Sequence, residues 1–67
     1  MSPEWWRGKV LKEIRQRRNL TQGELAAKVG VHLVTISRIE TGVRQPSMNL
    51  LQRLAKALKV KVGDLLE

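Results

Sequence analysis

The chain has 67 residues, enough for one domain spanning 1–67, and its 13 Lys and Arg against six Asp and Glu give a net charge of +7 and a pI near 11.0. With no cysteine and a single histidine, it lacks the residues for disulfides, thiolate metal sites or a histidine-based metal centre. No apolar run approaches the roughly 20 residues that cross a membrane and no signal-peptide pattern is visible, so we expect a cytoplasmic protein without membrane contact, metal or cofactor.

The first predicted helix starts close to the N-terminus, where Ser2-Pro3-Glu4 is typical of a helix start. Serine caps free N–H groups, proline suits the first helical position, and glutamate favours the positive end of the helix dipole. Gly8 disfavours helix, so the helix begins either at this signal or nearer Gly8. Asn19, which tolerates the left-handed conformation, ends it. The apolar stripe of this helix contains Trp6, Val10, Leu11 and Ile14.

The second predicted helix has a signal at each end. Thr21 and Glu24 match a capping box, in which each side chain accepts a hydrogen bond from the other residue's backbone N–H. Gly30 stops the helix, because only glycine adopts the required left-handed turn at little cost. The inner face of this helix is predicted to consist of Leu25, Ala26 and Val29.

A third helix is predicted over 33–41, with Gly42 ending it. Ile36, Ile39 and Glu40 share one side of this helix. His32, just before it, either caps the helix through a ring nitrogen or donates a hydrogen bond to a phosphate.

The fourth helix is predicted to start after Ser47, which caps it, and a short fifth helix covers about 62–66. No segment alternates with period two over a useful length, so we expect no sheet. The fold class is therefore all-α, a compact unit of five helices. The fourth helix carries a strong apolar stripe formed by Leu50, Leu51, Leu54, Ala55 and Leu58.

The segment 21–42 meets the requirements of two short helices that cross at a steep angle. The crossing point needs a small residue, Ala26, and the tight turn needs Gly30 four positions later. Such a helix-turn-helix offers its second helix to the major groove of DNA. The basic charge suits this partner, although charge alone leaves anionic surfaces and acidic proteins open. Seven positions in register carry the pattern: Leu25, Ala26, Val29, Gly30, Val31, Ile36 and Ile39.

The region from about Lys12 to Leu66 resembles the Cro/lambda-repressor-type (Xre-family) helix-turn-helix domain. The most specific matching stretches are LTQGELA, TISRIETG and PSMNLLQRLAKAL. The resemblance implies a lambda-repressor-like domain that binds operator DNA, commonly as a symmetric dimer. It also implies a structural ion pair between Arg15 and Glu40, and a phosphate contact from Gln22 at the start of the second helix. Free N–H groups at a helix N-terminus favour such a phosphate contact.

The outward face of the third helix supplies the candidate base contacts. Arg38 either forms two parallel hydrogen bonds with guanine or binds a phosphate. Leu33 and Val34 stand where the family often has polar residues. Val34 either meets thymine methyl groups or is merely exposed, and Leu33 either does the same or packs against the second helix. The expected base-contacting residues are Leu33, Val34, Ser37 and Arg38.

Residues around this helix are expected to touch the DNA backbone, which positions a protein without specifying sequence. Arg44 lies in the following loop, which commonly reaches the backbone in the family. Arg18 and Lys28 either add to the electrostatic field or are solvated, and solvation is the preferred interpretation for Lys28. The same interpretation is preferred for Lys56, Lys59 and Lys61. The expected backbone-contacting residues are Gln22, Thr35, Thr41, Arg44 and Arg17.

The predicted function is a sequence-specific DNA-binding transcriptional regulator, a repressor that binds a palindromic operator through the recognition helix at 33–41. No nucleophile, base and phosphate-binding loop come together in the sequence, so we expect no enzyme. The expected partners are double-stranded DNA and a second copy of the chain, at least on DNA. Two alternatives are an antitoxin-type module that binds a protein as well as its operator, and a non-specific architectural or RNA-binding protein. Candidates for the dimer contact are Trp5, Val60, Val62, Leu65 and Leu66, with a core role preferred for Leu65.

Overall fold

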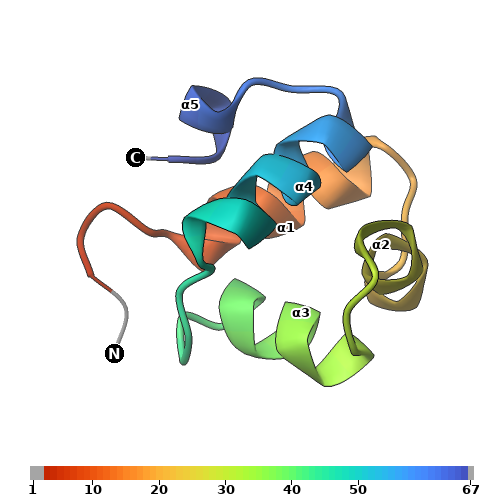
Figure 1. Ribbon diagram of the computed structural model, residues 1–67, viewed down its shortest axis with the longest axis horizontal. Helices are drawn as coiled ribbons and strands as arrows, with labels where there is room; N and C mark the ends of the chain where they lie inside the picture. Colours follow the sequence, from red (N-terminus) through yellow and green to blue (C-terminus); the bar gives the residue numbers. More distant parts are fainter. Residues whose placement is uncertain (1–2, 67) are drawn as a thin grey trace.

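The computed structural model describes residues 3–66, which form five α-helices and no strand (Figure 1). The predicted all-α, five-helix fold is therefore confirmed. The helices are α1 (Gly8–Arg17), α2 (Gln22–Val29), α3 (Leu33–Glu40), α4 (Met48–Leu58) and α5 (Val62–Leu65).

The core is aliphatic apart from one tryptophan, and the predicted apolar stripe of α4 is entirely buried in it. α2 packs against both α3 and α4, α1 packs against α3, and α5 packs against α4. At the corner between α2 and α3, Ala26 is 3% exposed and its carbonyl accepts a hydrogen bond from the backbone N–H of Val31 (3.0 Å). Gly30 ends α2 at φ +73°, as the turn requires.

Local signals also set the starts of α2 and α4. Thr21 and Glu24 form the predicted capping box, with N–H···O distances of 3.0 and 2.8 Å. Ser47 accepts a hydrogen bond from the first turn of α4. α3 ends at Glu40 and α5 at Leu65, one residue earlier than predicted, because the residue that follows each helix is its cap.

The first helix begins later than the Ser2-Pro3-Glu4 signal predicts. α1 begins at Gly8, the later of the two expected starts, and the expected cap, Ser2, lies outside the described residues. Trp6 precedes the helix and is 1% exposed, and its indole Nε1 donates to the carbonyl of Ile39 on α3 (3.0 Å). A Cβ at Gly8 would lie 2.3 Å from the carbonyl oxygens of Ile39 and Glu40. Glycine is therefore placed there because the backbones of α1 and α3 approach closely.

Candidate nucleic-acid interface

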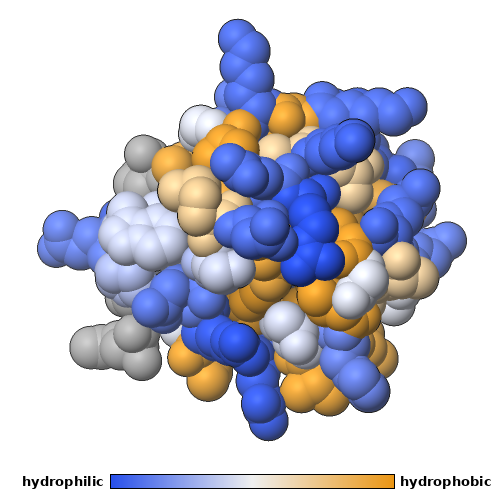
Figure 2. Space-filling model, viewed as in Figure 1, coloured by the Kyte–Doolittle hydropathy of each residue, from blue (hydrophilic) through white to orange (hydrophobic). Residues whose placement is uncertain are grey.

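The outward face of α3 is exposed and partly apolar. Leu33 and Val34 are each 48% exposed although both are large hydrophobic residues. Arg38 is exposed four positions after Val34, on the same face, and no hydrogen bond or ion pair from residues 3–66 holds its side chain. Figure 2 shows hydrophobic surface along the lower edge of the molecule, where Figure 1 places α3 and the loop after it. This face of α3 is open to a partner.

The opposite face of α3 is anchored in the core. Ile36 and Ile39 are fully buried, and Glu40 is 7% exposed. Residues three or four positions apart share one side of a helix, so the buried and exposed residues form two separate stripes. The core therefore fixes which residues α3 presents to solvent.

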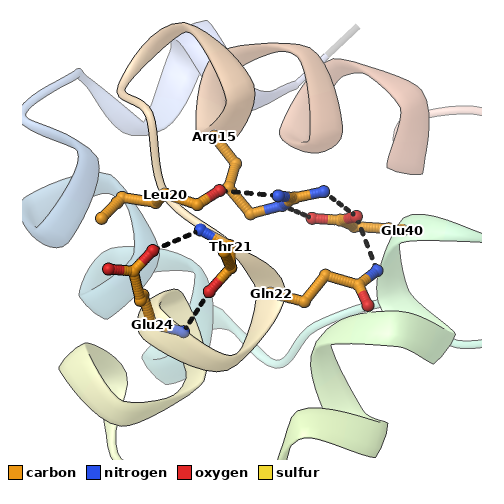
Figure 3. A network of polar contacts seen from close by, with 6 residues as sticks. All are labelled: Arg15, Leu20, Thr21, Gln22, Glu24 and Glu40. Atoms are coloured by element: carbon orange, nitrogen blue, oxygen red, sulfur yellow. Dashed lines mark hydrogen bonds and ion pairs between the residues drawn. The ribbon is translucent and has the colours of Figure 1, made fainter.

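A buried polar network joins α3 to α1 and to the start of α2 (Figure 3). Arg15 donates from Nε to Oε2 of Glu40 (2.6 Å) and from Nη2 to Oε1 (3.1 Å). A third donor of Arg15, Nη1, binds the carbonyl of Leu20 (2.7 Å). The amide Nε2 of Gln22 also donates to Oε1 of Glu40 (3.0 Å). Three elements thus meet at one carboxylate.

This network orients α3 because both charged groups are buried and fully hydrogen-bonded. The side chains of Arg15 and Glu40 are 8% and 2% exposed. Within residues 3–66, no buried side-chain nitrogen or oxygen lacks a hydrogen-bond partner. Breaking either half would leave an uncompensated buried charge, so the two helices are held in one relative orientation.

Gln22 lies at the N-terminus of α2 and is half-buried. One N–H of its amide is used by Glu40, and an amide nitrogen carries two. The second N–H therefore remains available beside the free backbone N–H groups of the first turn, which favour phosphate.

The remaining candidates near α3 occupy its end and its flanks. Thr41 is exposed, and its Oγ1 donates to the carbonyl of Arg38 (3.1 Å). Arg44 is exposed in the loop after α3, while Thr35 and Ser37 are half-buried. The ring cap considered for His32 is wrong, because this exposed side chain makes no capping hydrogen bond to α3.

Arg17 is not brought to this surface. It lies two positions after Arg15, about 200° around α1, and Arg15 points towards α3. Arg17 instead lines a hollow with Val60 and Asp64, beside the start of α5. The sequence shows the charge of Arg17 but not which side of α1 faces α3.

Metal ligands do not cluster in the part of the chain that the structure describes. No group of three or more His, Cys, Asp or Glu residues there is placed to hold a metal ion. The five helices of residues 3–66 are all too short or too polar to cross a membrane.

Comparisons with known proteins agree with this geometry. Residues 11–65 match the helix-turn-helix family model. An uncharacterised HTH-type transcriptional regulator from Archaeoglobus fulgidus is 40% identical over 55 residues, which cover 82% of this chain and 78% of that protein.

Two solved structures have the same fold. The P22 c2 repressor in complex with a synthetic operator gives a TM-score of 0.85 at 32% identity, covering 90% of this chain and 91% of that chain. The SinR protein in complex with the SinI protein gives a TM-score of 0.84 at 33% identity. This match covers 90% of this chain and 59% of that chain. The fold and the exposed α3 define a lambda-repressor-like helix-turn-helix protein. The chain belongs to the Cro/C1-type (Xre) helix-turn-helix family of DNA-binding transcriptional regulators.

Proposed function

We propose that this regulator recognises a specific operator by inserting α3 into the major groove, and that it represses transcription. The main support for this proposal is that Leu33, Val34 and Arg38 are exposed on one face of α3, while the opposite face is buried in the core and bound to α1. A rigid helix with such an outer face can present several side chains to base edges at once.

The proposed base contacts differ in chemistry. Arg38 donates two hydrogen bonds to O6 and N7 of a guanine. Val34 packs its methyl groups against a thymine methyl, and Leu33 extends this apolar contact at the leading end of α3. Ser37 lies between them and offers a hydroxyl to a base edge.

Backbone contacts are proposed for the residues that surround α3. Gln22, which is bound to Glu40 at the end of α3, donates its second amide N–H to a phosphate. Arg44, in the loop after α3, provides a positive charge for the backbone. Thr35 and Thr41 supply hydroxyl groups along the flanks. Arg17 is not part of this proposal because it lies on another side of α1.

We propose that two copies bind a palindromic operator, with half-sites roughly 34 Å apart or a multiple of that. Each copy is one domain, 1–67, and supplies one recognition helix. Trp5, at 44% exposed, and the partly buried Val60, Val62 and Leu66 are candidates for the contact between copies. Leu65 is fully buried, which suits the core role preferred for it.

The proposal assigns the protein to the cytoplasm and gives it no catalytic role, cofactor or metal. The exposed side chains on α3 are aliphatic and guanidinium groups, with half-buried hydroxyl groups beside them. These groups serve recognition well and do not form a nucleophile with its base.

A second candidate function is an antitoxin-type module that binds a protein partner as well as its operator. The exposure of Trp5 favours it, since tryptophan is enriched at protein interfaces. The structure of SinR with SinI shows that a protein of this fold takes a protein partner.

Selection from a pool of random duplexes at physiological salt tests the main proposal. The expected result is enrichment of a palindrome with two half-sites. If the pool stays unenriched although duplex binding is measurable, α3 does not recognise sequence.

A further inference from the structure

A second basic surface lies where α2 and α4 end. Two adjoining hollows of about 490 and 250 Å³ share Lys28, Ala57 and Lys59 in their walls. No acidic residue lines either hollow, and no residue of α3 does. The five cations around the two hollows, here called the basic groove, are Arg18, Lys28, Arg53, Lys56 and Lys59.

The negative C-terminal ends of α2 and α4 neutralise only part of this positive charge. Lys28 and Lys56 occupy the last turns of α2 and α4, where cations are favoured. Each helix end carries about half a negative elementary charge, so the two ends offset roughly one of the five cations. Glu24, one turn before Lys28, interacts electrostatically with it and offsets a further cation. A surplus of positive charge still remains in the basic groove.

Four of the five cations are available to a ligand. Arg53 is engaged, since its Nη1 donates to the carbonyl of Val29 (2.9 Å) and crosses from α4 to α2. Within residues 3–66, no hydrogen bond or ion pair holds the side chains of the other four. The basic groove thus combines one fixed guanidinium with four cations that still face solvent.

The floor of the basic groove is apolar. Ala57 and Leu20 are partly buried there, and Val29 lies beneath the larger hollow. A sugar-phosphate backbone matches the cations but brings no apolar group to this floor. A peptide that alternates carboxylates with aliphatic side chains matches both the cations and the apolar floor. Its aliphatic side chains would be buried at the centre of the groove, and its carboxylates would pair with the cations at the rim.

We propose that the basic groove docks an acidic, leucine-containing segment of a partner protein. The segment lies between the C-terminal ends of α2 and α4 with its carboxylates on the groove's cations. Because the groove shares no residue with α3, the regulator binds its operator and this partner at the same time.

The test uses the whole chain and the peptide acetyl-EELEELEE-amide as the probe. Titration of ¹⁵N-labelled protein is expected to shift the backbone amides of Lys28, Ala57 and Lys59 while those of α3 stay in place. The double variant Lys28→Gln/Lys59→Gln is expected to bind the peptide about fivefold more weakly or worse. The matched control Lys9→Gln/Lys12→Gln loses the same charge from exposed positions of α1 and is expected to change affinity less than twofold.

Three results would overturn the proposal. Peptide shifts that cluster on α3 would show that the peptide only competes for the DNA surface. Equal weakening in both double variants would show a response to net charge alone. A duplex of unrelated sequence that shifts the groove amides as strongly as the peptide would make nucleic acid the occupant. Operator binding by α3 is measured separately, so failure here leaves the proposed function intact.

Discussion

At the scale of single residues, Arg38 and Arg44 carry the same charge but are expected to contribute differently to DNA binding. Arg38→Ala should cost about 1–3 kcal/mol on the selected operator and relax the preference at one base position. Arg44→Ala should weaken binding to every duplex and reduce the salt slope by about one. Anisotropy titrations over single-base variants of the operator and a series of salt concentrations measure both effects. Equal loss on all duplexes for Arg38→Ala would reduce that residue to a phosphate contact.

Glu40 is the residue at which three elements meet, and its removal should be among the most damaging single changes. Glu40→Ala should cost about 3–5 kcal/mol because it leaves the charge of Arg15 buried and unpaired. A chain of this size has about 3–10 kcal/mol of total stability, so much of the variant should be unfolded.

The double variant Arg15→Met/Glu40→Leu is the control for that loss. It removes both charges and should be more stable than Glu40→Ala, since an apolar pair carries no desolvation penalty. Urea unfolding followed by circular dichroism compares the free energies of unfolding. A double variant that is less stable than the single one would mean that the ion pair itself, rather than charge burial, sustains the fold.

The partners of individual residues were only partly accessible from the sequence. The pairing of Arg15 with Glu40 was implied by the resemblance, and the structure adds Gln22 and Leu20 to it. The sequence did not reveal on which side of α1 Arg17 lies, because tertiary packing determines which side of α1 faces α3.

At the scale of elements, the close approach of α1 to α3 depends on Gly8. Gly8→Ala should destabilise the protein by about 1–3 kcal/mol or more, although alanine favours helix, because its Cβ would collide with backbone carbonyls. Gly23→Ala is the matched control in α2, where a Cβ meets only the Thr21 hydroxyl at 3.9 Å. This control should be neutral or stabilising by up to about 1 kcal/mol. Thermal unfolding compares the stability of the two variants. If Gly8→Ala and Gly23→Ala are equally stable, the backbones of α1 and α3 are not in tight contact at Gly8.

The capping box of α2 should make its stability depend on pH. The hydrogen bond from the backbone N–H of Thr21, with a further one involving its side chain, lowers the pKa of the Glu24 carboxyl from its ordinary value. The ionised form therefore contributes stability above the unfolded pKa, and this contribution is lost as the pH falls through the lowered folded pKa. The stability difference between wild type and Glu24→Gln should shrink on acidification in urea titrations. A difference that is constant across this range would exclude the linkage.

Three helix ends were predictable because a local signal sets each of them. Thr21, Gly30 and Ser47 act through their own neighbours, and the structure has them in the expected roles. The start of α1 was not predictable in this way, because Trp6 and Gly8 are placed by contacts with α3, which lies far along the chain. In the sequence, the hint of such a contact is a glycine two residues after a tryptophan in a helical pattern.

At the scale of the whole molecule, α1 fixes the C-terminal half of α3, and the N-terminal half presents Leu33 and Val34 to solvent. The helix-turn-helix pattern predicted that Ile36 and Ile39 are buried, and the resemblance implied the contact of Glu40 with α1. The basic groove could not be predicted, because its cations come from α2, from α4 and from the residues that follow α1 and α4. In the sequence, each of these lysines and arginines looks like a solvated surface residue, and only the fold brings them together.

Contact between the outer face of α3 and DNA can be measured residue by residue, in an NMR titration of the labelled protein with the selected operator. We expect the largest chemical-shift changes on the backbone amides of 33–41 and Gln22 and on the methyl groups of Leu33 and Val34. If these signals stay unmoved at saturation while the changes centre on α4 and α5, α3 does not contact the operator.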